Sequence, residues 1–218
     1  MSFPTPLDAV AFDLDGVLTD TAEAHYRAWR RLADRLDIPF DRAANEALKG
    51  VDRMGSLMLI LGDRPGYDDA QRATLAATKN DWYLEEIARF GPADLFLGAR
   101  EAIEQCRAAG LYVALASASR NAPLLLARMG IDALFDIVVD PATIARGKPA
   151  PDIFHAAARA ADVTPARMLG VEDAVGGIAA IRAAGMPSLG IGDPVLLAGA
   201  DRVIATIGDF DLRDYAVR

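Results

Sequence analysis

The chain has 218 residues, of which 52% are hydrophobic, so it can build a buried core. Asp and Glu number 31 against 23 Lys and Arg, a net charge of −8. This balance argues against nucleic acid or an anionic membrane as a partner, because both are bound through clustered cations.

The single cysteine and the first residues exclude several other classes of protein. Cys106 alone cannot form an internal disulfide or a thiolate metal cage, and its apolar surroundings predict a core residue. The N-terminal stretch lacks a basic segment followed by an apolar one, and no run reaches the roughly 18 to 20 apolar residues of a membrane span. We expect a cytoplasmic monomer that acts on small molecules.

Short apolar runs rich in β-branched or aromatic residues predict strands, and Ala-rich helical patterns follow most of them. The predicted strands span residues 8–13, 111–116, 135–139, 167–171 and 188–191. Strands that alternate with helices indicate a parallel sheet wrapped by helices. The pattern therefore predicts a doubly wound α/β core.

Between about residues 19 and 91 no strand pattern appears, and helical patterns follow one another. The first predicted apolar face consists of Ala22, Tyr26, Trp29, Leu32, Ala33 and Leu36. The second consists of Met54, Leu57, Met58 and Leu61. A third helix is predicted from about 68 to 89, before the helix-breaking Gly91 and Pro92. We expect a core of 1–18 and 92–218, with a helical cap, 19–91, inserted after the first strand.

Two carboxylates follow the first predicted strand, in the sequence DLDG at 13–16. The carboxyl ends of strands are where open α/β sheets bind ligands, which makes Asp13 and Asp15 candidates for chemistry. Asp and Gly are also ordinary turn formers, so the motif alone is weak evidence for catalysis and favours a plain turn.

Three more motifs follow the same logic. Ser117 to Asn121 (SASRN) follows a strand and precedes a helix, where hydroxyls and free N–H groups suit phosphate, although Ser119 or Asn121 could simply cap the helix. Lys148 lies in GKPAPD, before a helix starting near Pro151, and could instead be a solvated lysine. Glu172 and Asp173 end a strand before two glycines, where they could also cap a helix.

These four motifs come at the ends of successive predicted parallel strands and so converge on one crevice. Oxygen ligands such as Asp13, Glu172 and Asp173 suit Mg2+, which proteins hold with one or two carboxylates plus phosphate and water. The Lys148 cation would offset the charge that accumulates when a carboxylate attacks a phosphate. The sequence therefore predicts magnesium-dependent phosphoryl transfer.

In this order, DLDGVLTD, SxS, KPAPD and EDA resemble the haloacid dehalogenase superfamily, and closer details resemble its bacterial β-phosphoglucomutases over essentially the whole chain. The matching segments are DLDGVLTDTAEAHYRAW at 13–29, LKGVDR at 48–53, KND at 79–81, LASASRNAP at 115–123, DPA at 140–142 and KPAPDIF at 148–154. The resemblance implies a Rossmann-like core, a helical cap, Mg2+, and interconversion of β-glucose 1-phosphate and glucose 6-phosphate through a 1,6-bisphosphate.

The resemblance also implies roles residue by residue. Asp13 would be the nucleophile that is phosphorylated and Asp15 the general acid and base; Ser117 and Lys148 would complete the catalytic set. The implied metal site is Asp13, the Asp15 carbonyl, Glu172 and Asp173. The implied site of the transferring phosphate is Ser117, Ala118 and Lys148. The implied clamp on the other phosphate is Arg53, Ser119, Arg120 and Asn121. Residues that would shape the sugar pocket or couple cap closure to the acid/base are Thr21, His25, Trp29, Leu48, Lys49, Gly50, Ser56 and Lys79.

Apart from the resemblance, spacing alone allows Trp29 to be a core residue, His25 to face outward and Arg53 to be solvated. His155 gains no role and is expected to be structural. The sequence departs from the family pattern at Arg120, where Lys is usual, and at Asp52, where Ser is common. Asp52 could weaken or orient Arg53, so the departures bear on the sugar more than on the reaction.

Three other functions compete with the mutase. A phosphatase of this fold uses the same two aspartates but lets water attack the aspartyl phosphate. A phosphonate-cleaving relative needs a cap lysine as a Schiff base, for which Lys49 and Lys79 are present although their surroundings match the mutases. A sugar-phosphate-binding protein without activity would have no use for Asp13.

Overall fold

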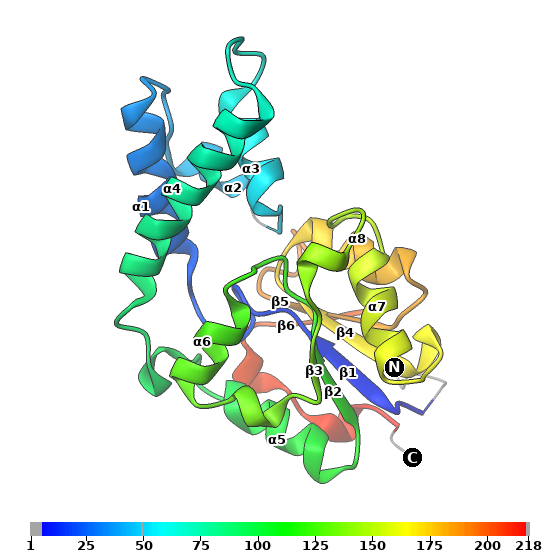
Figure 1. Ribbon diagram of the computed structural model, residues 1–218. Helices are drawn as coiled ribbons and strands as arrows, with labels where there is room; N and C mark the ends of the chain where they lie inside the picture. Colours follow the sequence, from blue (N-terminus) through cyan, green and yellow to red (C-terminus); the bar gives the residue numbers. More distant parts are fainter. Residues whose placement is uncertain (1–5, 49, 217–218) are drawn as a thin grey trace. The chain divides into compact units, whose positions relative to one another are not determined.

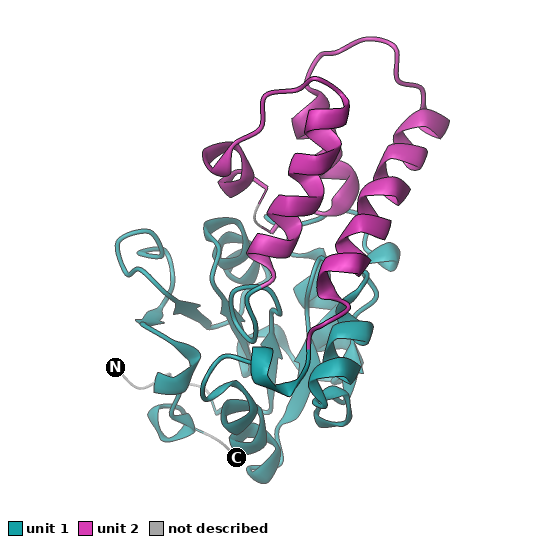
Figure 2. Ribbon diagram, turned by 90° about the vertical axis from the view of Figure 1, so that its left-hand side faces the viewer, with its two compact units in different colours: residues 1–20, 91–218 teal, residues 21–90 magenta. Residues whose placement is uncertain are grey.

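The computed structural model describes residues 6–48 and 50–216, and the chain divides into two compact units. Unit 1 comprises residues 1–20 and 91–218, and unit 2 comprises residues 21–90 (Figure 2). The boundaries predicted from the sequence were 1–18 with 92–218, and 19–91. Each unit has an apolar core of its own.

Unit 1 is built on a parallel sheet with the strand order β3-β2-β1-β4-β5-β6. The strands are β1 (Ala9–Phe12), β2 (Tyr112–Leu115), β3 (Ile137–Val138), β4 (Met168–Glu172), β5 (Ser188–Ile191) and β6 (Arg202–Ile204). The chain builds outward from β1 to β3, returns to β4 on the other side of β1, and continues to β6. This reversal makes the sheet doubly wound and confirms the predicted Rossmann-like α/β fold.

Helices cover both faces of this sheet (Figure 1). They are α5 (Ala99–Ala108), α6 (Ala122–Met129), α7 (Asp152–Ala160) and α8 (Val175–Ala183). Because strand side chains alternate, Ala9 and Ala11 share an apolar cluster with α7 and α8, whereas Phe12 contacts Phe210 edge-on, with ring centroids 6.4 Å apart. Cys106, on α5, is fully buried, as predicted.

Short 3-10 helices join these elements. They are η1 (Pro92–Asp94), η2 (Asp132–Leu134), η3 (Pro141–Thr143), η4 (Pro165–Arg167), η5 (Ile207–Asp209) and η6 (Leu212–Asp214). The sequence did not predict β6, because its three residues begin with a charged Arg202 and form no apolar run. The predicted strand at 135–139 is shorter in the structure, where β3 holds only Ile137–Val138.

The part of unit 2 that the structure describes consists of helices joined by turns and loops and contains no strand. Its helices are α1 (Ala22–Arg35), α2 (Arg42–Glu46), α3 (Arg53–Leu61) and α4 (Asp69–Ile87). Helices α1 and α4 lie side by side, and Trp29, Leu32 and Ala33 of α1 enter the unit's apolar core, as their spacing predicts. Helix α4 begins with a capping box in which Asp68 and Gln71 satisfy each other's backbone N–H groups.

Two features of unit 2 differ from the sequence prediction. The buried face of α3 consists of Ser56, Leu57, Ile60 and Leu61. Met54 and Met58, which were predicted to share the apolar face of Leu57, are about two-fifths exposed, because the helix is rotated toward Ile60. Helix α2 was not predicted, since it is short and buries none of its residues. Among the described residues, no helix combines the length and apolar character that a bilayer crossing requires.

Candidate active site

The predicted catalytic residues of unit 1 meet at the carboxyl edge of three neighbouring strands. Asp13 directly follows β1, Ser117 lies two residues after β2, and Glu172 is the last residue of β4. Strands β2, β1 and β4 are adjacent and parallel, so their carboxyl ends share one edge of the sheet. Residues more than 100 positions apart in sequence are thus brought together.

Lys148 lies at the centre of this group. Its Nζ donates to Asp13 Oδ1 at 2.7 Å and to Glu172 Oε1 at 2.5 Å. Lys148 is only 8% exposed, so the alternative of a solvated surface lysine is wrong. Burial opposes the charge on Lys148, but attraction to Asp13 and Glu172 outweighs it and raises the pKa of the ammonium above its usual value.

Asp13 is buried beside Lys148, and for its carboxyl group the effect of burial outweighs the attraction of the ammonium. Burial raises the pKa of the Asp13 carboxyl well above its usual range, and the charges of Glu172 and Asp15 add to this, while Lys148 opposes it. Two buried carboxyl groups, Asp13 and Glu172, thus share the single ammonium of Lys148, and their formal negative charge exceeds its positive charge. Such a group favours the binding of a further cation.

The acidic cluster fits a metal ion. One carboxylate oxygen from each of Asp13, Glu172 and Asp173 lies within 4.8 Å of the others. Two glycines make room for these carboxylates: a Cβ at Gly16 would overlap Asp173, and a Cβ at Gly177 would overlap Glu172. Gly16 also has a φ of +83°, which other residues rarely adopt. All the ligand atoms are oxygens, the type that hard divalent cations prefer.

Backbone amides fix the second oxygen of Glu172. Its Oε2 accepts from the N–H groups of Asp173 and Ala174, each at 2.9 Å. Glu172 therefore fixes the turn before α8 with one oxygen while its other oxygen binds Lys148.

The loop after β2 has its own internal hydrogen bonds. Ser117 is buried, and its Oγ accepts from Ser119 N at 3.1 Å. The Ser119 hydroxyl accepts from Asn121 N at 3.3 Å, and Asn121, at the N-cap position of α6, makes no side-chain cap bond. Ala118 is partly buried and Arg120 is exposed. The two serines thus shape a turn that ends at a helix N-terminus.

Asp15 lies two residues beyond Asp13 in a tight loop. It is partly buried and forms a β-bridge with Thr19, and the following Gly16 N–H donates to Thr19 O at 2.9 Å. Thr19 is itself tied by its hydroxyl to Asp94 O at 2.7 Å. The loop that carries Asp15 is therefore held by backbone contacts within unit 1.

In unit 2 the structure brings His25, Trp29 and Lys79 together around a buried charge. Lys79 is 2% exposed, and its Nζ lies 2.9 Å from His25 Nδ1. The same Nζ lies 4.5 Å from the ring centroid of Trp29 and 4.8 Å from that of Tyr83. Tyr83 stacks on His25 and was missed by the sequence analysis, although its position four residues after Lys79 on α4 placed it on the same face.

The state of His25 follows from these contacts. An ammonium can only donate, so Nδ1 of His25 accepts and the ring is neutral with its proton on Nε2. Burial lowers the pKa of His25 well below its usual value, and the charges of Lys79 and Arg53 lower it further. The alternative of an outward-facing His25 is therefore wrong.

The remaining predicted residues of unit 2 fall into different environments. Thr21 and Ser56 are buried, Leu48 belongs to the apolar core, and Gly50 has a φ of +73°. Arg53 is the first residue of α3, and Asp52 accepts from Gly55 N at 2.8 Å as its N-cap. Asp52, which stands where Ser is common in the family, thus has a local structural role as the cap of α3. Lys49 lies outside the described residues.

His155, for which a structural role was expected, lies on α7 with Nε2 at 3.3 Å from Ala184 O, a contact between the helix and the end of α8.

Comparison with protein families decides the relationship. The model of the haloacid dehalogenase-like hydrolases matches residues 7–185. The chain belongs to this family. It is 45% identical to a β-phosphoglucomutase of Bacillus subtilis (strain 168), over 94% of this chain and 92% of the relative. A crystal structure of β-phosphoglucomutase from Clostridium difficile superposes with a TM-score of 0.93 at 35% identity, covering 95% and 94% of the two chains.

Phosphatases also occur among the haloacid dehalogenase-like relatives. A fructose-1-phosphate phosphatase of Escherichia coli (strain K12) is 30% identical over 83% of this chain and 94% of its own. The expectation that the chain is an enzyme of this family, similar to phosphoglucomutase-type isomerases, is confirmed. The relatives act on phosphorylated sugars, and the acidic cluster at 13, 172 and 173 can hold a metal ion.

Proposed function

We propose that this enzyme is a β-phosphoglucomutase that interconverts β-glucose 1-phosphate and glucose 6-phosphate through a phosphorylated Asp13 and a 1,6-bisphosphate. The observation that carries the proposal is the Asp13–Lys148–Glu172 group at the sheet edge, in a chain that is 45% identical to a β-phosphoglucomutase over nearly its whole length. That similarity extends through unit 2 as well as unit 1.

In the proposed half-reaction, a sugar hydroxyl attacks the phosphorus of phosphorylated Asp13. The new O–P bond forms as the bond to the Asp13 carboxylate breaks, and Asp15 takes the hydroxyl proton. In the reverse direction Asp15 returns the proton to the departing sugar oxygen while Asp13 attacks. Lys148 holds Asp13 in place and offsets the negative charge of the transferring group.

The proposed metal is Mg2+, held by Asp13, Glu172, Asp173 and the Asp15 carbonyl. When bound, it would neutralise charge on the transferring phosphoryl group. Two features support this assignment: the three carboxylates converge, and glycines at 16 and 177 leave room for them. Their oxygen-only donor set matches the preference of Mg2+.

We assign binding of the two phosphates to separate residues. The transferring phosphate would be bound by Ser117, Ala118 and Lys148. The second phosphate would be bound by Arg53, Ser119, Arg120 and Asn121. Recognition of the sugar is assigned to Thr21, His25, Trp29, Leu48, Lys49, Gly50, Ser56 and Lys79. A guanidinium matches a phosphate in bidentate geometry, which supports Arg53 and Arg120 in this role.

The test is a phosphorus NMR time course with β-glucose 1-phosphate, Mg2+ and a trace of the 1,6-bisphosphate. A mutase yields glucose 6-phosphate, and the signal should appear only when the bisphosphate primes the enzyme. A reaction with EDTA in place of Mg2+ is the control for the metal. Accumulation of inorganic phosphate without glucose 6-phosphate would contradict the proposal.

A sugar-phosphate phosphatase is the second candidate, because relatives such as the fructose-1-phosphate phosphatase share most of the chain's length. Both reactions pass through phosphorylated Asp13, and they differ in whether a sugar hydroxyl or water attacks it. The ratio of glucose 6-phosphate to free phosphate in the same time course separates them.

A further inference from the structure

Helix α2 of unit 2 lies between two buried residues but buries none of its own. Phe40 before it and Leu48 after it belong to the apolar core of the unit, at 6% and 8% exposure. None of the residues of α2 (Arg42–Glu46) is buried. A helix of this length is unstable by itself, and without an apolar face it gains little from packing. Polar contacts must therefore fix its position.

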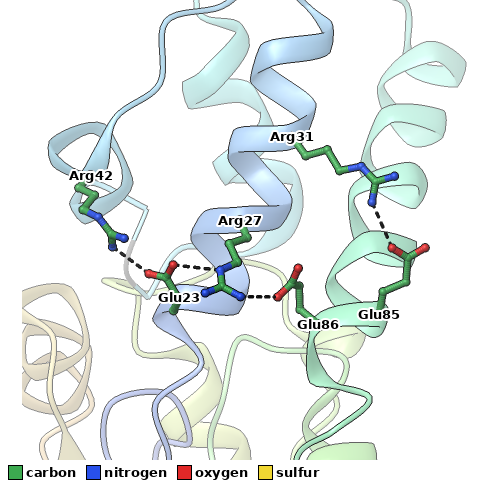
Figure 3. Close-up of polar contacts among 6 residues, drawn as sticks. All are labelled: Glu23, Arg27, Arg31, Arg42, Glu85 and Glu86. Atoms are coloured by element: carbon green, nitrogen blue, oxygen red, sulfur yellow. Dashed lines mark hydrogen bonds and ion pairs between the residues drawn. The ribbon is translucent and has the colours of Figure 1, made fainter.

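Arg42 makes these contacts from the first residue of the helix. Its Nη1 donates to Glu23 Oε2 on α1 at 2.9 Å, as Figure 3 shows. The guanidinium carbon also lies 4.5 Å from the ring centroid of Tyr26, which stacks on Phe40 at 6.0 Å. Arg42 thus joins α2 to α1 by an ion pair and by an aromatic face.

Glu23 also has an ion pair that does not involve Arg42. Arg27 donates to Glu23 at 3.0 Å and to Glu86 of α4 at 3.3 Å, so the four side chains link α2, α1 and α4 (Figure 3). Arg42 is the main cause that holds the pKa of Glu23 below its usual value, with Arg27 adding to the effect. Because Glu23 is already ordered, its pairing with Arg42 costs less side-chain entropy than an isolated surface pair does.

Hydrogen bonds connect α2 with the segment that leads to Arg53. Asp41 caps α2 through Ala44 N at 2.8 Å, and Asn45 O accepts from Leu48 N at 3.0 Å. Leu48 O accepts in turn from Val51 N at 3.1 Å, and Asp52 then caps α3. A shift of α2 would therefore move the backbone of the segment that follows it, in which Leu48, Gly50 and Arg53 are assigned to substrate.

We propose that Arg42, anchored on Glu23, is a positioning residue that sets the place of α2, of Leu48 and of residues 50–53, and thereby the affinity of the enzyme for its phosphorylated sugar. For the identity of the substrate this inference rests on the proposed function. Arg42 acts through the backbone and does not touch the substrate itself.

The expected effect is local. Exposed ion pairs contribute little to global stability, so loss of the Arg42 side chain should leave the melting temperature almost unchanged. The same loss should free α2 and weaken substrate binding, because ordering the segment then has to accompany binding. A change of about two- to fivefold in KM corresponds to the range measured for exposed pairs, with kcat within twofold of the parent.

Arg31→Ala is the matched control for Arg42→Ala. Arg31 is also an exposed arginine with an ion pair, to Glu85 at 3.1 Å, and an aromatic contact, to Trp82 at 4.3 Å. Its contacts lead to α4 instead of α2 (Figure 3). Arg42→Lys is the conservative variant, because an ammonium can still pair with Glu23 and lie over Tyr26.

The experiment combines hydrogen exchange of the peptide 42–52, measured without ligand, with KM and kcat for β-glucose 1-phosphate at saturating bisphosphate. Arg42→Ala should speed exchange in this peptide and raise KM, Arg42→Lys should restore both, and Arg31→Ala should change neither. Unchanged exchange in Arg42→Ala, or an equal rise in KM with Arg31→Ala, would overturn the inference. A parent enzyme that turns over no β-glucose 1-phosphate would instead overturn the proposed function, and the exchange measurement would still test Arg42.

Discussion

Lys148 in unit 1 and Lys79 in unit 2 are both buried, at 8% and 2% exposure, but their surroundings differ in kind. Lys148 donates to two carboxylates, Asp13 and Glu172, so formal negative charge compensates it. Lys79 contacts a neutral imidazole and the faces of two aromatic rings. A buried ammonium can thus be contacted by carboxylates, as at Lys148, and also by lone pairs and ring quadrupoles, as at Lys79.

The two environments suit different tasks. At Lys148 the formal negative charge of the carboxylates exceeds the positive charge of the ammonium, so the group has capacity for a further cation. At Lys79 the contacts with His25, Trp29 and Tyr83 fix the ammonium and the tautomer of His25, and none of these three contacts adds a negative charge. The first arrangement is typical of group transfer, and the second is typical of positioning.

The largest effect is expected at the carboxylate that Lys148 holds. Asp13→Asn should abolish turnover, because an amide is a poor nucleophile and a weaker metal ligand, while the side chain still accepts a hydrogen bond from Lys148. Turnover by phosphorus NMR and folding by circular dichroism check this. Parental rates in the variant under saturating Mg2+ would contradict covalent catalysis by Asp13.

Lys148→Met should come next, with a loss of both activity and stability. The substitution leaves Asp13 and Glu172 buried without their cation, and breaking a buried pair in this way costs about 3 to 5 kcal/mol. Because Lys148 is proposed to offset the charge of the transferring phosphate, its loss should lower kcat by about 100- to 1,000-fold. Urea denaturation followed by circular dichroism gives the free energy of unfolding.

A double variant tests the cause of that destabilisation. Lys148→Met with Glu172→Gln removes one of the two stranded carboxylates, and glutamine can still accept from the amides of Asp173 and Ala174. Part of the lost stability should return. The comparison also needs the free energy of unfolding of Glu172→Gln alone. If adding Glu172→Gln to Lys148→Met lowered this free energy as much as Glu172→Gln lowers it in the parent, the two side chains would not be coupled.

The sequence predicted unit 1 well because the order of its strands determines which candidate residues lie together. Apolar runs located five of the strands, and parallel strands bring the residues after them to one edge. Strand order along the chain was therefore enough to group Asp13, Lys148, Glu172 and Asp173. The role of Gly177 could not be inferred, because the space it leaves for Glu172 depends on side-chain packing.

Unit 2 was less predictable. Helix α1 has a strong apolar stripe, whereas α2 has no buried face and left no periodic signal. The apolar residues of α3 surround most of the helix, so their spacing did not show that Met54 and Met58 are exposed. Tyr83 was missed because an aromatic residue on a helix is read as core, and its contact with Lys79 becomes visible only in three dimensions.

Lys79→Met is the matched counterpart of Lys148→Met and should be far milder for stability. Methionine fills a similar volume and can keep contact with the aromatic face of Trp29, although His25 Nδ1 loses its donor. We expect a change in the free energy of unfolding of at most about 2 kcal/mol, with activity lowered about tenfold through loss of one charge-assisted contact. An equal destabilisation by the two Lys→Met variants would contradict the contrast between the sites.

The smallest expected effect is a pH dependence of the stability of unit 2. Burial, together with the charges of Lys79 and Arg53, holds the pKa of His25 well below its usual value, so the folded enzyme keeps the ring neutral. The unfolded chain binds a proton with a pKa of about 6.5. As the pH falls below about 6.5, the unfolded state gains protons that the folded state does not, and stability decreases by at most about 1.4 kcal/mol per pH unit. Above that pH this contribution to stability is complete and constant.

His25→Asn should remove this slope, because the asparagine carbonyl can accept from Lys79 but does not titrate. The chain has two histidines, so His155→Asn, on α7 of unit 1, is the matched control and should retain the slope. Trp29 and Trp82 are the two tryptophans of the chain and both lie in unit 2, so urea denaturation followed by their fluorescence between pH 7.5 and about 5.5 reports on this unit. In Lys79→Met the slope should level off at a higher pH than in the parent, since one of the charges that lower the His25 pKa is gone. If the slope persisted in His25→Asn, another group would be titrating. The assignment of a neutral His25, on which the contrast between Lys79 and Lys148 depends, would then be wrong.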